Sequence, residues 1–140
     1  MADQFFRTRL LVGDEPLARL AAAKVAVFGV GGVGGFCVEA LARAGVGTLH
    51  LYDDDTVSES NLNRQIVALH STIGQPKAEV MARRILDINP ACQVEVFRMF
   101  YLPENADQVD LSQYDYVVDC IDTVAAKLDL AERCTTLQVP

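Results

Sequence analysis

The stretch over residues 25–35 constrains the fold more than any other part of the sequence. It reads VAVFGVGGVGG, so an unbroken apolar run passes directly into a glycine-rich turn. Apolar strands without polar alternation are typical of parallel sheets that helices cover on both faces. Gly29, Gly31 and Gly34 match the dinucleotide-binding fingerprint, in which glycines permit a tight turn and close contact with phosphate. With Gly32 beside them, they predict a nucleotide phosphate at a helix N-terminus.

Strand-like and helix-like segments alternate along the chain. Apolar or alternating runs predict strands over residues 24–30, 48–52, 93–97 and 114–121. Helical spacing predicts helices over residues 14–22, 33–44, 77–89 and 123–137, and the long connection 54–73 is expected to hold a helical turn near residues 61–69. This order predicts an α/β fold with a doubly wound, mostly parallel, Rossmann-like sheet and helices on both faces.

Apolar spacing also predicts the buried faces of two helices. In helix 33–44, the stripe expected to face the sheet consists of Val33, Cys37, Leu41 and Ala44. In helix 77–89, it consists of Val80, Met81, Ile85 and Ile88.

Length and charge limit what the chain can do alone. With 140 residues, 51% of them hydrophobic, residues 1–140 are expected to form one domain with a buried core. The net charge of −7 argues against a nucleic-acid-binding surface within this segment, because such surfaces are usually basic. No apolar run approaches the length of a membrane span, so no integral membrane segment is expected. The start of the chain, with Asp3, Arg7 and Arg9, lacks a signal-peptide pattern and predicts a cytoplasmic protein.

The cysteines show no metal-binding or disulfide pattern. No two of them are spaced as C-x-x-C, so the sequence supports neither a zinc site nor a disulfide framework. Buried free thiols are therefore expected at Cys37, Cys92, Cys120 and Cys134.

An acidic run follows the second predicted strand. Asp53 comes about twenty residues after the glycine turn, the offset at which an acid binds ribose hydroxyls in dinucleotide sites. The alternative to a nucleotide-binding site is that the turn over residues 29–34 is rich in glycine for packing alone. Asp55 belongs to the same run and is a candidate for attracting a divalent cation, although such runs are usually solvated loops.

The sequence SNLNRQ, over residues 60–65, adds donors at the same edge of the sheet. Arg64 follows the second strand closely, and a guanidinium there can bind phosphate oxygens bidentately. Asn61 and Gln65 supply neutral donors. The alternative is a helix capped by Ser60 or Asn61, with Arg64 on the surface.

Lys77 stands at the start of a predicted helix, where a cation opposes the helix dipole. An anion should compensate, and a triphosphate fits. The chain has no G-x-x-x-x-G-K-[ST] motif, so Lys77 and Arg64 are expected to do the work of a P-loop lysine. Asp119 and Asp122 end the last strand near the same edge. Asp122 is the candidate that holds Mg²⁺ against the phosphates, whereas Asp119 can instead cap a turn.

These motifs together resemble the ThiF/MoeB/HesA superfamily, the adenylating relatives of ubiquitin-activating enzymes. The resemblance rests on GVGGVG (29–34), DDDTVSESNLNRQ (53–65), GQPK (74–77) and DCID (119–122), which cover nearly the whole chain in order. Members bind ATP and Mg²⁺, adenylate a carboxylate and release pyrophosphate. The resemblance implies that residues 1–140 are the N-terminal part of an ATP-binding adenylation domain, with a C-terminal half beyond Pro140.

The resemblance also implies roles for individual residues. Gly31 and Asp53 hold the adenosine, while Asn61, Arg64 and Lys77 hold phosphates. Asp122 holds the metal ion. Arg9 matches an arginine that reaches into the partner's ATP site in the family's homodimers, so the implied catalytic residues are Arg64, Lys77 and Arg9.

Within the superfamily, the chain is most similar to the tRNA threonylcarbamoyladenosine dehydratases. The segments RTRLLVG (7–13), NRQIVAL (63–69), KAEVM (77–81) and INPAC (88–92) carry this similarity. It implies that the carboxylate of threonylcarbamoyladenosine in tRNA is adenylated and then cyclised with loss of water, and that tRNA binds through regions outside this segment.

Three alternatives remain open from the sequence. One is activation of the C-terminus of a ubiquitin-like sulfur-carrier protein, although those enzymes tend to have Gln at the position of Asn63 and Asn at that of Thr123. Another is an NAD-binding Rossmann domain. The last is an inactive segment whose substrate-binding residues lie elsewhere.

Overall fold

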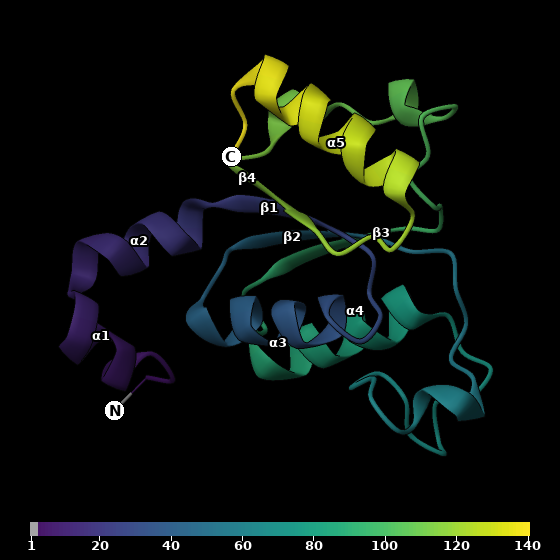
Figure 1. Cartoon of the computed structure of the whole chain (residues 1–140). Coiled ribbons are helices and arrows are strands. Elements are labelled where there is room, and N and C mark those ends of the chain that lie inside the picture. Colours follow the sequence, from purple (N-terminus) through teal and green to yellow (C-terminus); the bar gives the residue numbers. More distant parts are fainter. Residues whose placement is uncertain (1–2) are drawn as a thin grey trace.

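A parallel sheet of four strands forms the centre of the fold (Figure 1). The structure is a computed structural model that describes residues 3–140. The strands are β1 (Lys24–Phe28), β2 (Thr48–Tyr52), β3 (Gln93–Phe97) and β4 (Tyr116–Asp119). They lie in the order β3-β2-β1-β4, and each neighbouring pair is parallel.

Helices cover both faces of this sheet, as predicted. α3 (Gly34–Ala44) and α4 (Lys77–Ile88) lie together on one face, and α5 (Val124–Leu137) lies on the other (Figure 1). α1 (Phe6–Val12) and α2 (Asp14–Ala22) precede β1 and lie to one side of the sheet (Figure 1). The doubly wound α/β fold is therefore confirmed. No helix within residues 3–140 is both long enough and apolar enough to cross a membrane.

Several element boundaries differ from the prediction. β1 ends at Phe28 because Gly29 takes a left-handed φ of 91° and begins the turn. β4 is shorter than residues 114–121, and α1 was not predicted as a helix. In the long connection, the helical turn comes earlier than expected, as a 3₁₀ turn at Glu59–Asn61.

The sheet separates two apolar clusters, one under each helical layer. Val27 and Leu51 point toward α3 and α4, whereas Ala26 and Phe28 point toward α5. Successive residues of β1 thus enter opposite clusters, which explains why the strand is apolar throughout.

The buried face of α3 differs from the predicted stripe. Gly34, Gly35, Val38 and Ala42 are buried, while Val33 is 73% exposed. The reason is a backbone contact, because a Cβ on Gly34 would lie 1.7 Å from the Gly29 carbonyl oxygen. This contact turns the glycine side of α3 toward the sheet. In α4 the prediction is confirmed, since Val80, Met81 and Ile85 are buried and Ile88 packs against them.

We expect Ile85→Ala in α4 to lower the free energy of unfolding by about 2–5 kcal/mol, because Ile85 is fully buried and its loss leaves a cavity. Its neighbour Leu86 is 45% exposed, so Leu86→Ala should change stability by less than about 0.5 kcal/mol. Urea unfolding of both variants checks this expectation. Equal losses would show that α4 packs on the sheet by a different face.

Candidate functional site

A cavity of about 850 Å³ opens at the carboxyl ends of the strands. Its walls come from the glycine turn after β1, the end of β2, the 3₁₀ turn, the start of α4 and the connection between β4 and α5. This edge of an open parallel sheet is where ligands bind in doubly wound folds. The cavity is therefore the candidate ligand site.

Ten of the predicted site residues line this cavity. They are Gly29, Gly31, Gly32, Asp53, Asp55, Asn61, Arg64, Gln65, Lys77 and Asp122. Gly34 does not line it but packs against Gly29 beneath the turn. Arg9 also lies outside the cavity of its own chain.

Arg9 belongs to the N-terminal helices. Its guanidinium pairs with Asp3 at 2.7 Å and with Asp14 at 2.8 Å. It borders a smaller hollow between α1 and α2, together with Phe5 and Leu17. These contacts fix α1 against α2, and the predicted contact of Arg9 with a partner's site stays a prediction.

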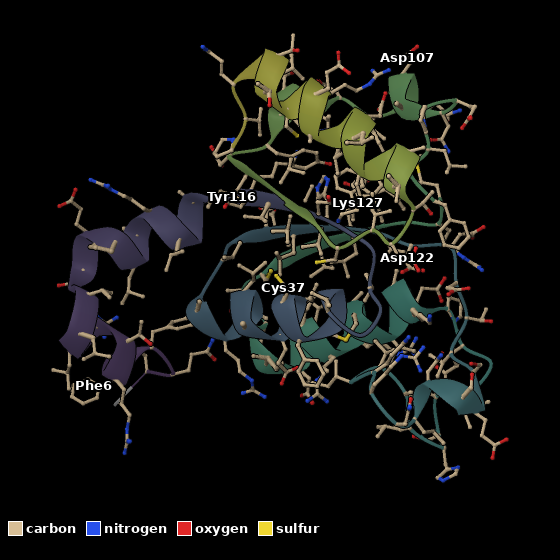
Figure 2. All side chains as sticks on the ribbon, viewed as in Figure 1. Phe6, Cys37, Asp107, Tyr116, Asp122 and Lys127 are labelled. Carbon is tan, nitrogen blue, oxygen red and sulfur yellow. The ribbon has the colours of Figure 1, made fainter. Side chains whose placement is uncertain are left out.

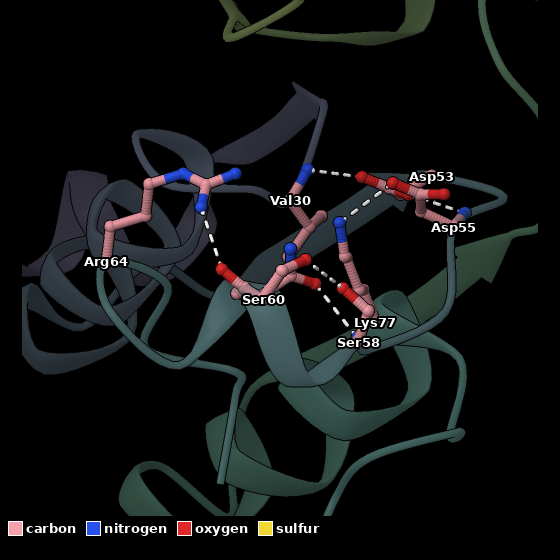
Figure 3. A network of polar contacts seen from close by, with 8 residues as sticks. Val30, Asp53, Asp55, Ser58, Ser60, Arg64 and Lys77 are labelled. Carbon is pink, nitrogen blue, oxygen red and sulfur yellow. Dashed lines mark hydrogen bonds and ion pairs between the residues drawn. The ribbon is translucent and has the colours of Figure 1, made fainter.

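Asp53 connects the glycine turn to the connection that follows β2. The residue is only 7% exposed, and its Oδ2 accepts the Val30 N–H at 2.7 Å (Figure 3). Its Oδ1 accepts the Asp55 N–H, also at 2.7 Å. A carboxylate oxygen can accept a second bond, so Asp53 can still bind a ligand hydroxyl. Its first role is structural, because it holds two walls of the cavity together.

The Lys77 ammonium is buried at the start of α4, with its side chain 5% exposed. It pairs with Asp55 Oδ2 at 2.8 Å (Figure 3). Asp55 therefore balances the charge of this ammonium within the chain, and the expected contact of Lys77 with phosphate stays a prediction. The Asp55 side chain is 57% exposed, so a phosphate entering the cavity can replace it as the partner of Lys77.

Arg64 is exposed at the cavity and is held only by local bonds. Its guanidinium donates to the Ser60 carbonyl oxygen at 3.1 Å (Figure 3). It also donates to Asn63 Oδ1 at 2.9 Å. Ser58, rather than Ser60 or Asn61, precedes the 3₁₀ turn as its N-cap. Asn61 Oδ1 accepts the Ser58 N–H, which leaves the Asn61 amide hydrogens to serve as donors.

Gln65 carries a further sign that a ligand binds here. Its residue is 9% exposed, and its Oε1 is buried without a hydrogen-bond partner among residues 3–140. A buried oxygen without a partner costs about 1–3 kcal/mol, so such groups are rare. Because Gln65 lines the cavity, a ligand or a ligand-bound water can satisfy it.

The two aspartates after β4 take different roles. Asp119 accepts the Ile121 N–H at 3.0 Å and pairs with Lys127 at 2.9 Å, so it stabilises a local turn. Asp122 is exposed at the cavity and has no hydrogen bond or ion pair with the rest of residues 3–140; Figure 2 shows it between β4 and α5. No group of three or more potential metal ligands occurs in the described part of the chain.

An aromatic wall completes the cavity, and the sequence did not predict it. The Phe28 ring stacks on Tyr52 with centroids 4.3 Å apart and meets the edge of Tyr101 at 5.2 Å. Phe100 and Leu102 continue this wall. The signal available in the sequence was the cluster FRMFY over residues 97–101, directly after a predicted strand. A flat, apolar wall suits an aromatic base.

Buried hydrogen bonds fix this wall from behind. The Tyr52 and Tyr114 hydroxyls lie 2.6 Å apart, and Tyr114 also bonds His50 Nδ1 at 2.8 Å. Burial lowers the pKa of His50, so its ring is neutral at neutral pH. The Tyr101 hydroxyl donates to Asp129 Oδ2 at 2.6 Å, and burial together with this carboxylate raises the pKa of Tyr101. The wall is therefore preformed.

Asp53→Asn is expected to lower the free energy of unfolding by about 1–3 kcal/mol. Both carboxylate oxygens accept backbone N–H groups, and an amide can accept only at its single oxygen. The matched control is Asp54→Asn. Asp54 is exposed, and its one ion pair, with Arg98, is long at 3.9 Å and therefore weak. Urea unfolding compares the two, and an equal effect would contradict the bridging role of Asp53.

The chain is similar to known proteins over its whole length. The tRNA threonylcarbamoyladenosine dehydratase of Bacillus subtilis is 48% identical over 140 residues, which are 100% of this chain and 55% of that protein. The sulfur carrier protein adenylyltransferase of Thermus thermophilus is 35% identical, and the match covers 99% of this chain and 51% of that protein. The chain thus spans about half the length of these curated relatives.

A solved structure has a similar fold. The crystal structure of the Escherichia coli tRNA N6-threonylcarbamoyladenosine dehydratase in complex with ATP matches with a TM-score of 0.92 and 44% identity. The match covers 98% of this chain and 56% of that one. The model of the ThiF family matches residues 6–140, so the chain belongs to the ThiF family.

Proposed function

We propose that this chain forms the ATP site of an enzyme that adenylates the carboxylate of threonylcarbamoyladenosine in tRNA. The observation that carries the proposal is the layout of the cavity. Lys77 and Arg64 line the same cavity as the glycine turn, and the aromatic wall forms another part of its lining. The relatives at the highest identities quoted above are dehydratases of this modified tRNA, and one of them was solved with ATP.

The chemistry explains why such a site needs cations more than it needs a base. A carboxylate is a poor electrophile because its leaving group would be oxide, and joining it to AMP corrects this. The carboxylate is already an anion when it attacks the α-phosphate, so no general base is required for that step. The glycine-turn N–H groups, Asn61, Arg64 and Lys77 are proposed to bind the phosphates and to neutralise the charge that develops there.

The later step uses the activated substrate itself. The acyl adenylate has AMP as its leaving group, and an internal nucleophile of the modified nucleoside then closes a ring. The net result is loss of water from the nucleoside. Gly31 and Asp53 are proposed to hold the ribose and the neighbouring phosphate, and the aromatic wall is proposed to hold adenine.

Asp122 is proposed to hold Mg²⁺ against the phosphates. Its carboxylate is exposed at the cavity without a partner among the described residues, and oxygen is the ligand that Mg²⁺ prefers. Mg²⁺ commonly binds one or two carboxylates together with substrate phosphates, so a single aspartate fits. When bound, the ion neutralises phosphate charge.

The proposed partners of the enzyme are a second copy of itself and tRNA. Arg9 is proposed to act in the ATP site of a second copy, within a homodimer, because it does not reach the cavity of its own chain. The net charge of −7 favours tRNA binding through regions outside residues 1–140. A cytoplasmic location accords with a tRNA substrate.

A second candidate substrate is the C-terminal carboxylate of a ubiquitin-like carrier. The sulfur carrier protein adenylyltransferase of Thermus thermophilus, 35% identical, favours it. The identity is lower than the 48% of the Bacillus subtilis dehydratase, so the tRNA carboxylate is preferred.

Arg64→Ala is expected to weaken ATP binding about tenfold to a hundredfold, because it removes a charge-assisted hydrogen bond to phosphate. Its melting temperature should barely change, because Arg64 is exposed and makes only local bonds. Arg83→Ala is the matched control, since Arg83 is exposed on α4 and bonds Gln75 outside the cavity. Isothermal titration with ATP and Mg²⁺ measures the affinities. Tighter binding of NAD than of ATP would overturn the proposed nucleotide.

Pyrophosphate exchange distinguishes the two substrates. We expect exchange to rise with tRNA that carries threonylcarbamoyladenosine and not with unmodified tRNA, because only the former has the reacting carboxylate. A sulfur-carrier protein with a free C-terminus is the competing substrate. Exchange with the carrier alone would reject the dehydratase assignment in favour of the second candidate.

A further inference from the structure

A lysine outside the cavity lining holds the short connection that carries Asp122. Lys127 lies at the end of the first turn of α5, and Figure 2 labels it together with Asp122. Its ammonium donates to the Ile121 carbonyl oxygen at 3.0 Å and pairs with Asp119 Oδ2 at 2.9 Å. Ile121 and Asp122 line the cavity, whereas Lys127 does not. The lysine therefore reaches the candidate metal-binding segment only through its backbone.

Side chains hold both backbone polar groups of Ile121. Asp119, the last residue of β4, accepts the Ile121 N–H through Oδ1 at 3.0 Å, while Lys127 donates to the Ile121 carbonyl oxygen. Because Asp119 Oδ2 also pairs with Lys127, the three residues form a closed ring of contacts, the Lys127 clamp. The Ile121 carbonyl belongs to the planar peptide that leads into Asp122, so the clamp fixes the orientation of that peptide.

The sequence DCIDTVAAK, over residues 119–127, accounts for this reach. Side chains of a helix lean toward its N-terminus, so a lysine in the first turn of α5 extends back over the connection from β4. A cation near the start of a helix opposes the helix dipole, and the Asp119 carboxylate offsets that cost. The lysine is thus placed where it contacts the connection rather than the body of the helix.

The clamp also gives the two neighbouring carboxylates different tasks. Both oxygens of Asp119 are engaged within the protein, one by the Ile121 N–H and the other by Lys127. Asp122, in contrast, forms no hydrogen bond or ion pair with the rest of residues 3–140. Because Lys127 is balanced by Asp119, Asp122 keeps its negative charge for a ligand in the cavity.

We propose that Lys127 is a positioning residue for the metal ion of the ATP site. By holding the peptide before Asp122, it directs the Asp122 carboxylate to one place in the cavity, and it does so without touching the ion or the nucleotide. The clamp itself stands on the contacts described above. Its effect on Mg²⁺ rests on the proposed function, in which Asp122 holds that ion against the phosphates.

The exposure of the clamp separates positioning from a general role in stability. The Lys127 side chain is 43% exposed and that of Asp119 is 30% exposed. Ion pairs in contact with water contribute little to stability, because the solvent screens them and the long side chain loses freedom. Ligand sites are more sensitive, since a displacement of about 1 Å can cost up to about a hundredfold. Loss of Lys127 should therefore affect Mg²⁺-dependent binding more than the melting temperature.

The first measurement is amide hydrogen exchange of the full-length protein without nucleotide. Lys127→Met removes the charge and keeps a long side chain. We expect the Ile121 amide to exchange about twofold to fivefold faster, because Asp119 is no longer held by its cation. Lys24→Met is the matched control, since Lys24 bonds Gln113 at the amino end of β1, away from the cavity. It should leave the Ile121 amide unchanged.

The second measurement titrates ATP into the same proteins, once with Mg²⁺ and once with EDTA. Lys127→Met is expected to bind ATP about tenfold more weakly with Mg²⁺ but less than about twofold more weakly in EDTA, because it acts through the ion. Asp122→Asn should show the same Mg²⁺-specific loss. Lys127→Arg keeps a cation with several donors, so it should restore slow exchange and Mg²⁺-dependent binding. Lys24→Met should bind ATP as the unaltered protein does.

Other outcomes overturn the inference. Unchanged exchange of the Ile121 amide in Lys127→Met rejects the clamp. ATP binding that is unchanged, or equally weakened with Mg²⁺ and with EDTA, rejects positioning through Asp122. A large fall in melting temperature that Lys127→Arg does not reverse shows a purely structural role. If the unaltered protein binds no ATP, or if Asp122→Asn binds it normally with Mg²⁺, the proposed function is contradicted instead, and hydrogen exchange still decides the clamp.

Discussion

The contact between Gly34 and Gly29 is the constraint on which the site depends. A side chain at Gly34 would collide with the Gly29 carbonyl oxygen at 1.7 Å, so α3 can begin against the end of β1 only because both residues are glycine. This approach sets the rotation of α3 and decides which of its residues are buried. It also leaves the first turn of the helix beside the cavity.

Asp53 secures the other side of the same turn. Its two oxygens join Val30 to Asp55, so one buried carboxylate connects the glycine turn with the segment that leads to Lys77. The aromatic wall is fixed separately, through bonds from Tyr52 to the buried Tyr114 and from Tyr101 to the partly buried Asp129. The cavity thus has polar and apolar parts, each held by contacts of its own.

Much of the fold could be predicted because it follows from local pattern. Apolar runs and helical spacing gave the bounds of β2 and β3 without error, and the alternation of strand-like and helix-like segments predicted the parallel sheet. The buried face of α3 could not be predicted, because it depends on one backbone contact with Gly29 that apolar spacing does not register.

In the site too, some features follow from the sequence pattern and others depend on contacts between distant residues. Residues that lie directly after strands, such as Asp53 and Asp122, could be placed at the cavity from topology. The partners of those residues could not. The pairing of Asp55, a candidate for attracting a divalent cation, with Lys77 was not foreseen, and Tyr101 reaches the cavity only through a long connection whose path the sequence does not reveal.

The ion pair between Lys77 and Asp55 bears on how the proposed nucleotide would leave the cavity. An empty site with a bare, buried ammonium would hold any phosphate tightly, because it has no other way to balance its charge. Here the exposed Asp55 carboxylate already pairs with the ammonium. If Lys77 binds phosphate as proposed, Asp55 can replace each departing phosphate, and the buried charge stays balanced when product leaves.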